Sequence, residues 1–165
     1  MDRSPSSPSI SGTISAVSAS AFTASPGGNL PNGHEDREFL DMESAFVRTG
    51  GLLSGSDVAH RLRRHVDQPP STLARWIVAR TIVCFEWHSH LLVPMFQFEP
   101  AEMTPLISVV DVMRVLTNVF DDWEAALWFA RPNAGLGGRV PVDVVGHDPV
   151  LVLNAARTDH VIARS

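Results

Sequence analysis

From Glu35 onward, proline and glycine break the 165-residue chain into short segments, so its fold has to be built from short helices and strands. Apolar residues recur at helical spacing in most of these segments, whereas TIVCFEW and LLVPMFQF are rich in β-forming residues. A chain of this length supports one ordinary domain or two very small ones. We therefore expect a mainly α fold with a small β-hairpin, in which an N-terminal helix-turn-helix-like module precedes a small helical domain.

The composition of the first 34 residues differs from that of the rest of the chain. Serine, alanine, glycine, proline and threonine dominate it, and such a segment cannot bury enough apolar surface to offset the entropy lost on ordering. We expect a disordered tail over residues 1–34, the helix-turn-helix-like module with its hairpin over residues 35–99, and the helical domain over residues 100–165.

Composition also disfavours several classes of protein. The formal net charge of −5 gives no sign of a polybasic nucleic-acid binder over the whole chain. The single cysteine, Cys84, cannot form an intrachain disulfide and fits a reducing compartment. No apolar run approaches the ~18 residues of a membrane span, and the N-terminal stretch lacks the continuous apolar core of a secretory signal. We expect a cytoplasmic protein.

Three helices are predicted before the hairpin. Apolar residues at helical spacing predict the first over EDREFLDMESAFVRTGG, with Gly50 placed to end it. Ser56 and Ser71 are each placed to cap a short helix that carries an apolar stripe. Two short helices joined by a tight turn form the outline of a helix-turn-helix motif.

Arginines make the region of these two short helices locally basic on an acidic protein. Residues 57–80 contain five arginines against Asp57 and Asp67. In a helix-turn-helix motif, the start of the second helix enters the major groove while the first helix lies across the backbone. The alternative is that these arginines form only a solvated face. The candidate DNA contacts are Arg61, Arg63, Arg64, Ser71, Thr72 and Arg75.

The hairpin sequence holds four potential metal ligands. TIVCFEW and LLVPMFQF predict its strands, HSH lies between them, and Pro94 predicts an edge position for the second strand. Cys84, Glu86, His88 and His90 would share one face of a single extended strand. No second ligand cluster completes a structural zinc site, however, and a turn at HSH removes the shared face. We therefore expect no metal site, with a small metalloenzyme centred on Cys84 and His88 as the alternative.

The last third of the chain predicts further helices. Thr104 and Pro105 are in the usual order to start one, and Asp121 and Glu124 have capping-box spacing at the start of the next. A short helix, PVDVV, follows a glycine-rich turn, and VLVLNAAR follows Asp148. This last helix is apolar on nearly every side, so we expect part of it to pack on another chain.

No catalytic or cofactor-binding motif stands out. The stretch ARPNAGLGGRVP lacks the Gly-x-Gly-x-x-Gly spacing and the Walker lysine of phosphate-binding loops, and no strand precedes it. Serine nucleophile motifs are absent. Asp121, Asp122 and Glu124 cluster, but a helix start favours acidic residues for dipole reasons alone. We expect neither a cofactor nor a catalytic residue.

The stretch WEAALWFARPNAGLGGRVPVDVV resembles the signature of the Xre/MbcA/ParS toxin-binding domain of bacterial antitoxins. That family shows a tryptophan on a helix, then Pro-Asn, a Leu-Gly-Gly turn and a proline that opens a short apolar helix. Upstream, LLVPMFQFEP resembles the Pro-x-Phe-Gln-Phe strand that often precedes this domain. The matching residues are Pro94, Phe96, Gln97, Phe98, Trp128, Pro132, Asn133, Leu136, Gly137, Gly138 and Pro141.

This resemblance implies a non-catalytic binding protein of a type II toxin-antitoxin system. Such antitoxins neutralise a RES-domain toxin that consumes NAD, and they block access to its active site with their C-terminal region. They often dimerise and repress their own operon through the helix-turn-helix region, so the resemblance also implies a homodimer. Arg157, His160 and Arg164 are candidate toxin contacts from their position alone. A solitary helix-turn-helix DNA-binding regulator of transcription, without a toxin partner, is the alternative.

Overall fold

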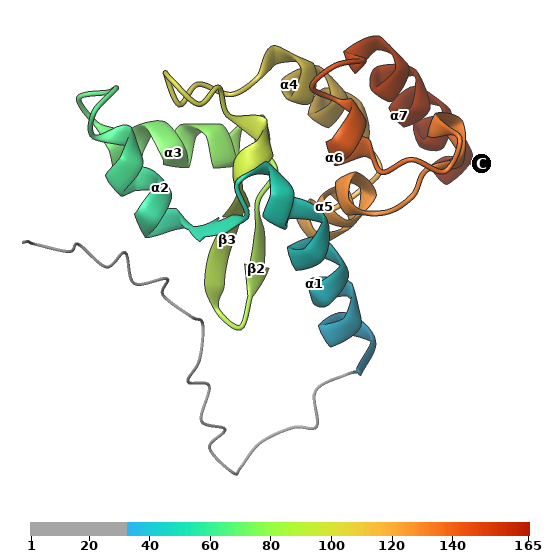
Figure 1. The fold of residues 1–165 in the computed structure, drawn as a ribbon, viewed down its shortest axis with the longest axis horizontal. Helices are drawn as coiled ribbons and strands as arrows, with labels where there is room; N and C mark the ends of the chain where they lie inside the picture. Colours follow the sequence, from blue (N-terminus) through green and yellow to red (C-terminus); the bar gives the residue numbers. More distant parts are fainter. Residues whose placement is uncertain (1–32) are drawn as a thin grey trace, which may run out of the picture. The chain divides into compact units, whose positions relative to one another are not determined.

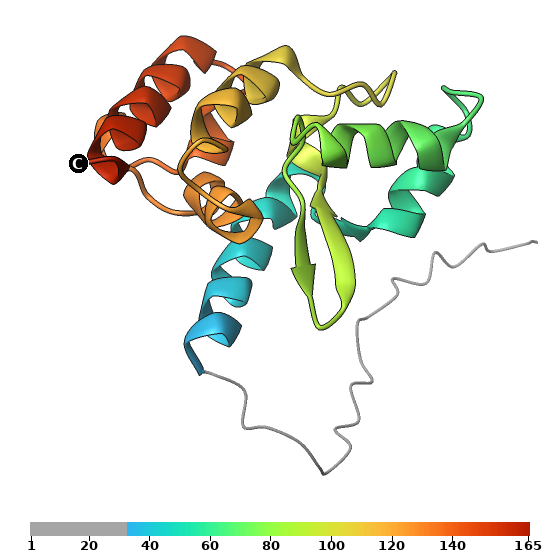
Figure 2. The same ribbon diagram turned by 180° about the vertical axis from the view of Figure 1, so that it is seen from behind.

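The computed structural model describes residues 33–165, which form a mainly helical unit with a small antiparallel sheet (Figure 1; Figure 2). The predicted fold class is thereby confirmed. The predicted tail over residues 1–34 lies outside the described residues except for its last two positions, where the first helix begins. In chain order, the elements are α1 (Gly33–Phe46), η1 (Val47–Thr49), β1 (Leu52–Ser54), α2 (Gly55–Leu62), α3 (Pro69–Val78), β2 (Phe85–Trp87), β3 (His90–Pro94), η2 (Met95–Gln97), α4 (Ile107–Leu116), α5 (Asp122–Ala130), η3 (Ala134–Leu136), α6 (Pro141–Val144) and α7 (Pro149–Ala163).

The sheet has the strand order β1-β3-β2, and both outer strands run antiparallel to β3. The predicted edge position of the strand that contains Pro94 is therefore wrong. Pro94 is the last residue of β3, opposite Leu52, and the next residue, Met95, donates its N–H to the Gly51 oxygen at 3.0 Å. The missing proline N–H thus falls where the ladder ends. The sequence does not predict β1, because three residues are too few to show a period.

His88 and Ser89 form the two-residue turn between β2 and β3. Their φ angles of 47° and 64° lie in the left-handed region, as in the mirror-image turns that match the twist of hairpin strands. His90 is already the first residue of β3 and pairs with the last residue of β2. The second strand is shorter than predicted, because it ends at Pro94 and the chain continues as the 3-10 turn η2.

Two predicted helix caps are displaced. Ser54, not Ser56, caps α2, and its hydroxyl oxygen accepts a 3.1 Å hydrogen bond from the backbone N–H of Asp57. The next helix, α3, begins at Pro69, so Ser71 lies inside it and does not cap it. Proline suits the first helical turn because its φ is already helical and its missing N–H has no partner there.

The start of α4 is also later than predicted from Thr104 and Pro105. Pro105 forms an isolated β-bridge with Phe98, and Leu106 donates its N–H to the Gln97 oxygen at 2.7 Å. The backbone therefore stays extended through Leu106, and the helix begins at the following residue.

The starts of α5 and α7 are as predicted. Glu124 donates its N–H to Asp121 Oδ1 at 2.8 Å, and Asp121 donates its N–H to Glu124 Oε2 at 2.9 Å, which completes the capping box. Asp148 caps α7 by accepting the N–H of Leu151 at 3.1 Å. The last helix runs to Ala163, well beyond the predicted VLVLNAAR.

The described unit contains two apolar cores. The first joins α1 to α4, α5, α6 and α7 through side chains such as Met42, Phe46 and Phe129. The second lies between α2, α3 and the sheet and includes Leu73 and Cys84. The first core therefore spans the predicted boundary at residue 99, because α1 packs with helices from the other side of it.

Aromatic stacking and a buried carboxylate fasten α1 to the hairpin and to α5. Trp87 stacks between Phe39 and Trp123, with ring centroids 4.5 Å and 5.5 Å away. Glu38 accepts a 3.0 Å hydrogen bond from the Trp123 indole and forms a 3.1 Å ion pair with Arg131. The indole hydrogen bond is the largest cause of a lowered pKa for Glu38; burial opposes it, while His34 and Arg131 add to it.

Gln97 is fully buried, and its side chain makes the hydrogen bonds that a neighbouring strand would otherwise make to the backbone of Val83. Its Oε1 accepts the N–H of Val83 at 2.5 Å, and its Nε2 donates to the oxygens of Val83 and Pro94, both at 2.8 Å. The backbone just before β2, which has no strand beside it, is satisfied in this way. This residue of the Pro-x-Phe-Gln-Phe motif is therefore structural.

Arg80 joins the end of α3 to the turn between α4 and α5. Its Nε donates to Asp122 Oδ1 at 3.0 Å, its Nη1 to the Thr117 oxygen at 3.0 Å and its Nη2 to the Phe120 oxygen at 2.9 Å. The guanidinium thus occupies carbonyls that the end of α4 leaves free. Of the five arginines in the basic region, this one is engaged inside the fold.

Candidate functional site

The turn after α5 is closed by the side chain and backbone of Asn133. Its Oδ1 accepts the N–H of Gly135 at 2.8 Å, and its backbone oxygen accepts that of Gly138 at 2.9 Å. Gly137 and Gly138 have φ angles of 65° and 81°, which residues with a Cβ rarely adopt. The Pro-Asn and Leu-Gly-Gly parts of the motif therefore build one rigid turn, which α6 follows at Pro141.

Asp159 on α7 ties this turn to α5. Its Oδ2 accepts a hydrogen bond from the indole Nε1 of Trp128 at 2.7 Å and another from Nδ2 of Asn133 at 2.6 Å. Two polar groups of the motif are thus satisfied by a single carboxylate of the last helix. Sequence reasoning missed Asp159, because it lies 26 residues after Asn133 and belongs to no recognisable pattern.

The three candidate toxin contacts at the C-terminus differ in placement. His160 is half-buried, and its Nδ1 lies 3.0 Å from the backbone oxygen of Val115 at the end of α4. Arg157 and Arg164 are exposed, and their guanidinium groups make no hydrogen bond or ion pair with another residue of 33–165. His160 therefore holds α7 in place, whereas the two arginines are open to a partner.

One face of α7 is buried and the rest is open. Ala155 and Ala156 lie in the first core, whereas the side chains of Val150, Val161 and Ile162 are 68%, 64% and 66% exposed. Val161 and Ile162 are adjacent, and contiguous exposed apolar side chains often mark an interaction surface. The packing of this helix on another chain stays a prediction. Such a contact would cover the side chains of Val161 and Ile162.

A shallow pocket of about 360 Å³ opens beside the motif, with Trp128, Pro132 and Asn133 in its wall. Glu38 and Arg131 line it too and are already paired with each other. Their charges therefore offset each other in the wall of the pocket.

The candidate DNA contacts are not equally available. Arg61, Arg63 and Arg64 are exposed at the end of α2 and in the turn that follows. Arg75 is exposed on α3, but Thr72 is buried and its hydroxyl accepts a 3.5 Å hydrogen bond from Arg75. Ser71 is exposed in the first turns of α3.

The hairpin does not bring the four potential metal ligands together. Cys84 is buried ahead of β2, Glu86 lies within β2, and His88 occupies the turn. Burial raises the pKa of the Cys84 thiol to about 11, and the negative charge of Asp122 adds to the effect, so the thiolate that binds metals is disfavoured. Among residues 33–165, no group of three or more histidine, cysteine, aspartate or glutamate side chains is placed to hold a metal ion.

None of the helices in the described part of the chain is long and apolar enough to cross a membrane.

The rigid turn, Asp159 and the exposed end of α7 all lie among the C-terminal helices. Residues 115–153 match the model of the antitoxin Xre/MbcA/ParS C-terminal toxin-binding domain, which confirms the resemblance carried by the motif. This part of the chain is therefore similar to the toxin-binding domains of that antitoxin family, which bind a toxin. No curated protein and no solved structure matches the chain.

Proposed function

We propose that this protein is the antitoxin of a type II toxin-antitoxin pair and that its partner is a RES-type toxin that consumes NAD. The match of residues 115–153 to an antitoxin toxin-binding domain carries the proposal. The RES type follows from the resemblance of the full motif, including the upstream Pro-x-Phe-Gln-Phe segment. Neutralisation by binding requires no catalytic group on this chain, only a surface that occupies the toxin.

The exposed end of α7 is the surface that we assign to the toxin. Val161 and Ile162 offer apolar area, and Arg157 and Arg164 offer guanidinium groups without a partner among residues 33–165. Arginines beside apolar side chains are common at the centre of protein interfaces, where they supply hydrogen bonds and buried area together.

Co-expression with a RES toxin, which we expect to be encoded beside this gene, tests the proposal. We expect growth and cellular NAD to recover, and we expect the double variant Val161→Asp, Ile162→Asp to lose the rescue. Val150→Asp is the matched control, since Val150 is equally exposed at the other end of α7. Loss of NAD despite soluble wild-type antitoxin would contradict the proposal.

We further propose that the protein represses its own operon through α2 and α3 as a homodimer. Arg61, Arg63, Arg64 and Arg75 are exposed and have no ion-pair partner among residues 33–165, so they are available to phosphates. The buried Thr72 is left out of this surface. A dimer would present two copies of α3 to two half-sites.

Gel-shift titrations on the promoter of the operon test the repression. We expect Arg75→Ala to weaken binding and to flatten its salt dependence, because each lost phosphate contact releases one fewer counterion. Arg157→Ala is the control, and the mass of the free protein in solution tests the dimer. Specific DNA binding without any rescue from a toxin would instead favour a solitary transcriptional regulator.

A further inference from the structure

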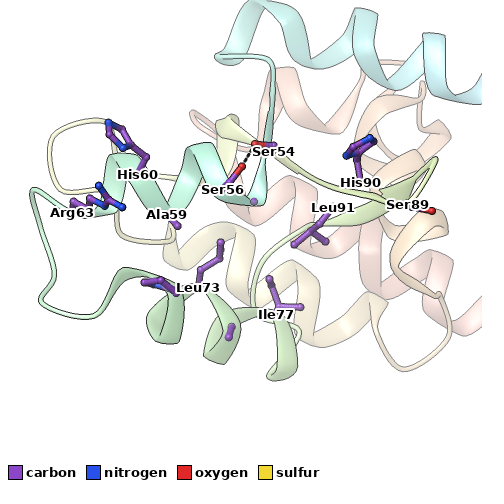
Figure 3. A pocket seen from close by; sticks show the side chains of 13 residues that line it. Ser54, Ser56, Ala59, His60, Arg63, Leu73, Ile77, Ser89, His90 and Leu91 are labelled. Atoms are coloured by element: carbon purple, nitrogen blue, oxygen red, sulfur yellow. Dashed lines mark hydrogen bonds between the residues drawn. The ribbon is translucent and has the colours of Figure 1, made fainter.

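A groove between α2, α3 and the hairpin lies outside the segment that matches the toxin-binding domain (Figure 3). Its volume is about 640 Å³, which is within the range of sites that bind ligands or peptide side chains. Three elements from different parts of residues 54–91 form its walls. The proposed toxin contact at α7 does not use this groove, and the proposed DNA contacts use only Arg63 at its rim.

The floor of the groove is apolar and incompletely covered. Leu73 and Ile77 of α3 and Leu91 of β3 converge on it, opposite Ala59 of α2 (Figure 3). Leu73 is buried, whereas the other three side chains are only half-buried although they pack against the second core. Covering such surface stabilises a complex by roughly 25 cal/mol per Å² of apolar area removed from water.

The rim of the groove is basic. Arg63 directly follows α2, His60 lies on α2 and His90 lies on the hairpin, and no aspartate or glutamate lines the groove. This is a local reversal on a chain whose formal net charge is −5. The charge complementary to this rim is therefore negative.

We propose that this groove binds an acidic, amphipathic peptide segment of a partner protein. Apolar side chains of the segment would lie on Leu73, Ile77 and Leu91, and a carboxylate would meet Arg63. Segments of this kind dock on grooves through apolar anchors spaced along one face, and flanking charges set their orientation. A DNA duplex would use the arginine but would leave the apolar floor exposed, so the floor favours a peptide.

Selection from a displayed library of random peptides of about 12 residues tests the proposal on the full-length protein. We expect the enriched sequences to combine two or more large apolar residues with at least one aspartate or glutamate. A labelled peptide of the consensus sequence should bind at least about tenfold more weakly to Ala74→Glu, which places a carboxylate in the groove. Ala74 is exposed on α3 and lines the groove, so this substitution leaves the second core intact.

Ala79→Glu is the matched control, because Ala79 is exposed directly after α3 and does not line the groove. Arg63→Ala should weaken binding of the peptide several-fold, more at low salt than at high salt.

A library that yields no binders, or only basic ones, would overturn the proposal, as would equal weakening of peptide binding by both alanine-to-glutamate variants. Displacement of the peptide by random duplex DNA at lower concentrations than by the unlabelled peptide would assign the groove to nucleic acid instead. Each of these results leaves toxin rescue by α7 unaffected, so the two proposals fail separately.

Discussion

The indole of Trp128 donates a 2.7 Å hydrogen bond to the carboxylate of Asp159, 31 residues later in the chain. The same carboxylate oxygen receives the Asn133 amide, so α5, the glycine turn and α7 meet at one acceptor. This arrangement explains how a motif made of turn residues can set the direction of the helix that carries the exposed apolar end.

Replacing Asp159 by alanine tests that arrangement. Two donors would lose their acceptor, and we expect the free energy of unfolding to fall by about 2–3 kcal/mol, because hydrogen bonds to a charged group contribute more than neutral ones. Urea unfolding followed by circular dichroism measures the change. Thr158→Ala serves as the neighbouring control, since its hydroxyl bonds only within α7; equal effects of the two substitutions would show that the carboxylate is not special.

Gln97 should be intolerant of an apolar replacement of similar length. Gln97→Met removes the only side-chain partners of the Val83 N–H and oxygen within residues 33–165, and we expect a loss of about 2–3 kcal/mol. Gln68→Met is the matched control, because Gln68 is exposed and makes no capping hydrogen bond. Thermal unfolding of both variants against the wild type measures the difference, and a Gln97→Met midpoint equal to that of the control would refute the structural role.

Gly50 cannot carry a side chain where it ends the first helical segment. Its φ is 104°, and a Cβ would lie 2.8 Å from the Met95 Cβ, so strain and overlap add. We expect Gly50→Ala to cost about 1–3 kcal/mol, whereas Gly146→Ala, which would meet no atom within 4 Å, should change stability little. Denaturant midpoints of the two variants give the comparison, and the expectation fails if they coincide.

Alkaline pH should destabilise the protein through Cys84. The pKa of the folded thiol is raised to about 11 from its ordinary value of 9.0, so between these values the unfolded thiol loses a proton that the folded one keeps. Stability contributed by the neutral buried thiol is therefore complete below pH 9.0 and is lost as the pH rises towards 11. At roughly 1.4 kcal/mol per pKa unit, the loss approaches about 3 kcal/mol.

The chain has no tyrosine and no lysine, so no side chain of these types titrates in the same pH range as Cys84. Urea unfolding at a series of pH values should show a decline above pH 9.0 in the wild type and a much flatter profile in Cys84→Ala. The comparison concerns the slope, since the substitution also removes buried volume. Parallel slopes would mean that the thiol is not the titrating group.

Features that depend on neighbouring residues were predictable from the sequence, and features that depend on distant ones were not. The Asp121–Glu124 capping box rests on contacts three residues apart and is confirmed, and the last helix begins after Asp148 as predicted. The left-handed Gly137 is likewise a local property of the turn.

The wrong or missing predictions depend on residues that are distant in the sequence. Pro94 was assigned to an edge because β1 could not be foreseen, and α4 starts late because Pro105 pairs with Phe98 in space. The anchor at Asp159 and the clamp at Arg80 depend on side chains brought together only by the folded core. Local sequence patterns predict the motif and its turns. Tertiary contacts determine which polar side chains hydrogen-bond to those turns.

The sharing of one core by α1 and the C-terminal helices limits how the protein can be divided. A fragment that begins at residue 100 would lack Met42 and Phe46, and their apolar surroundings would face water. Such a fragment should aggregate or bind other apolar surfaces non-specifically. Its apparent affinity for a toxin would then not measure specific binding. Truncation between α1 and the matched segment therefore removes part of the first core, so α1 is not an independent N-terminal extension.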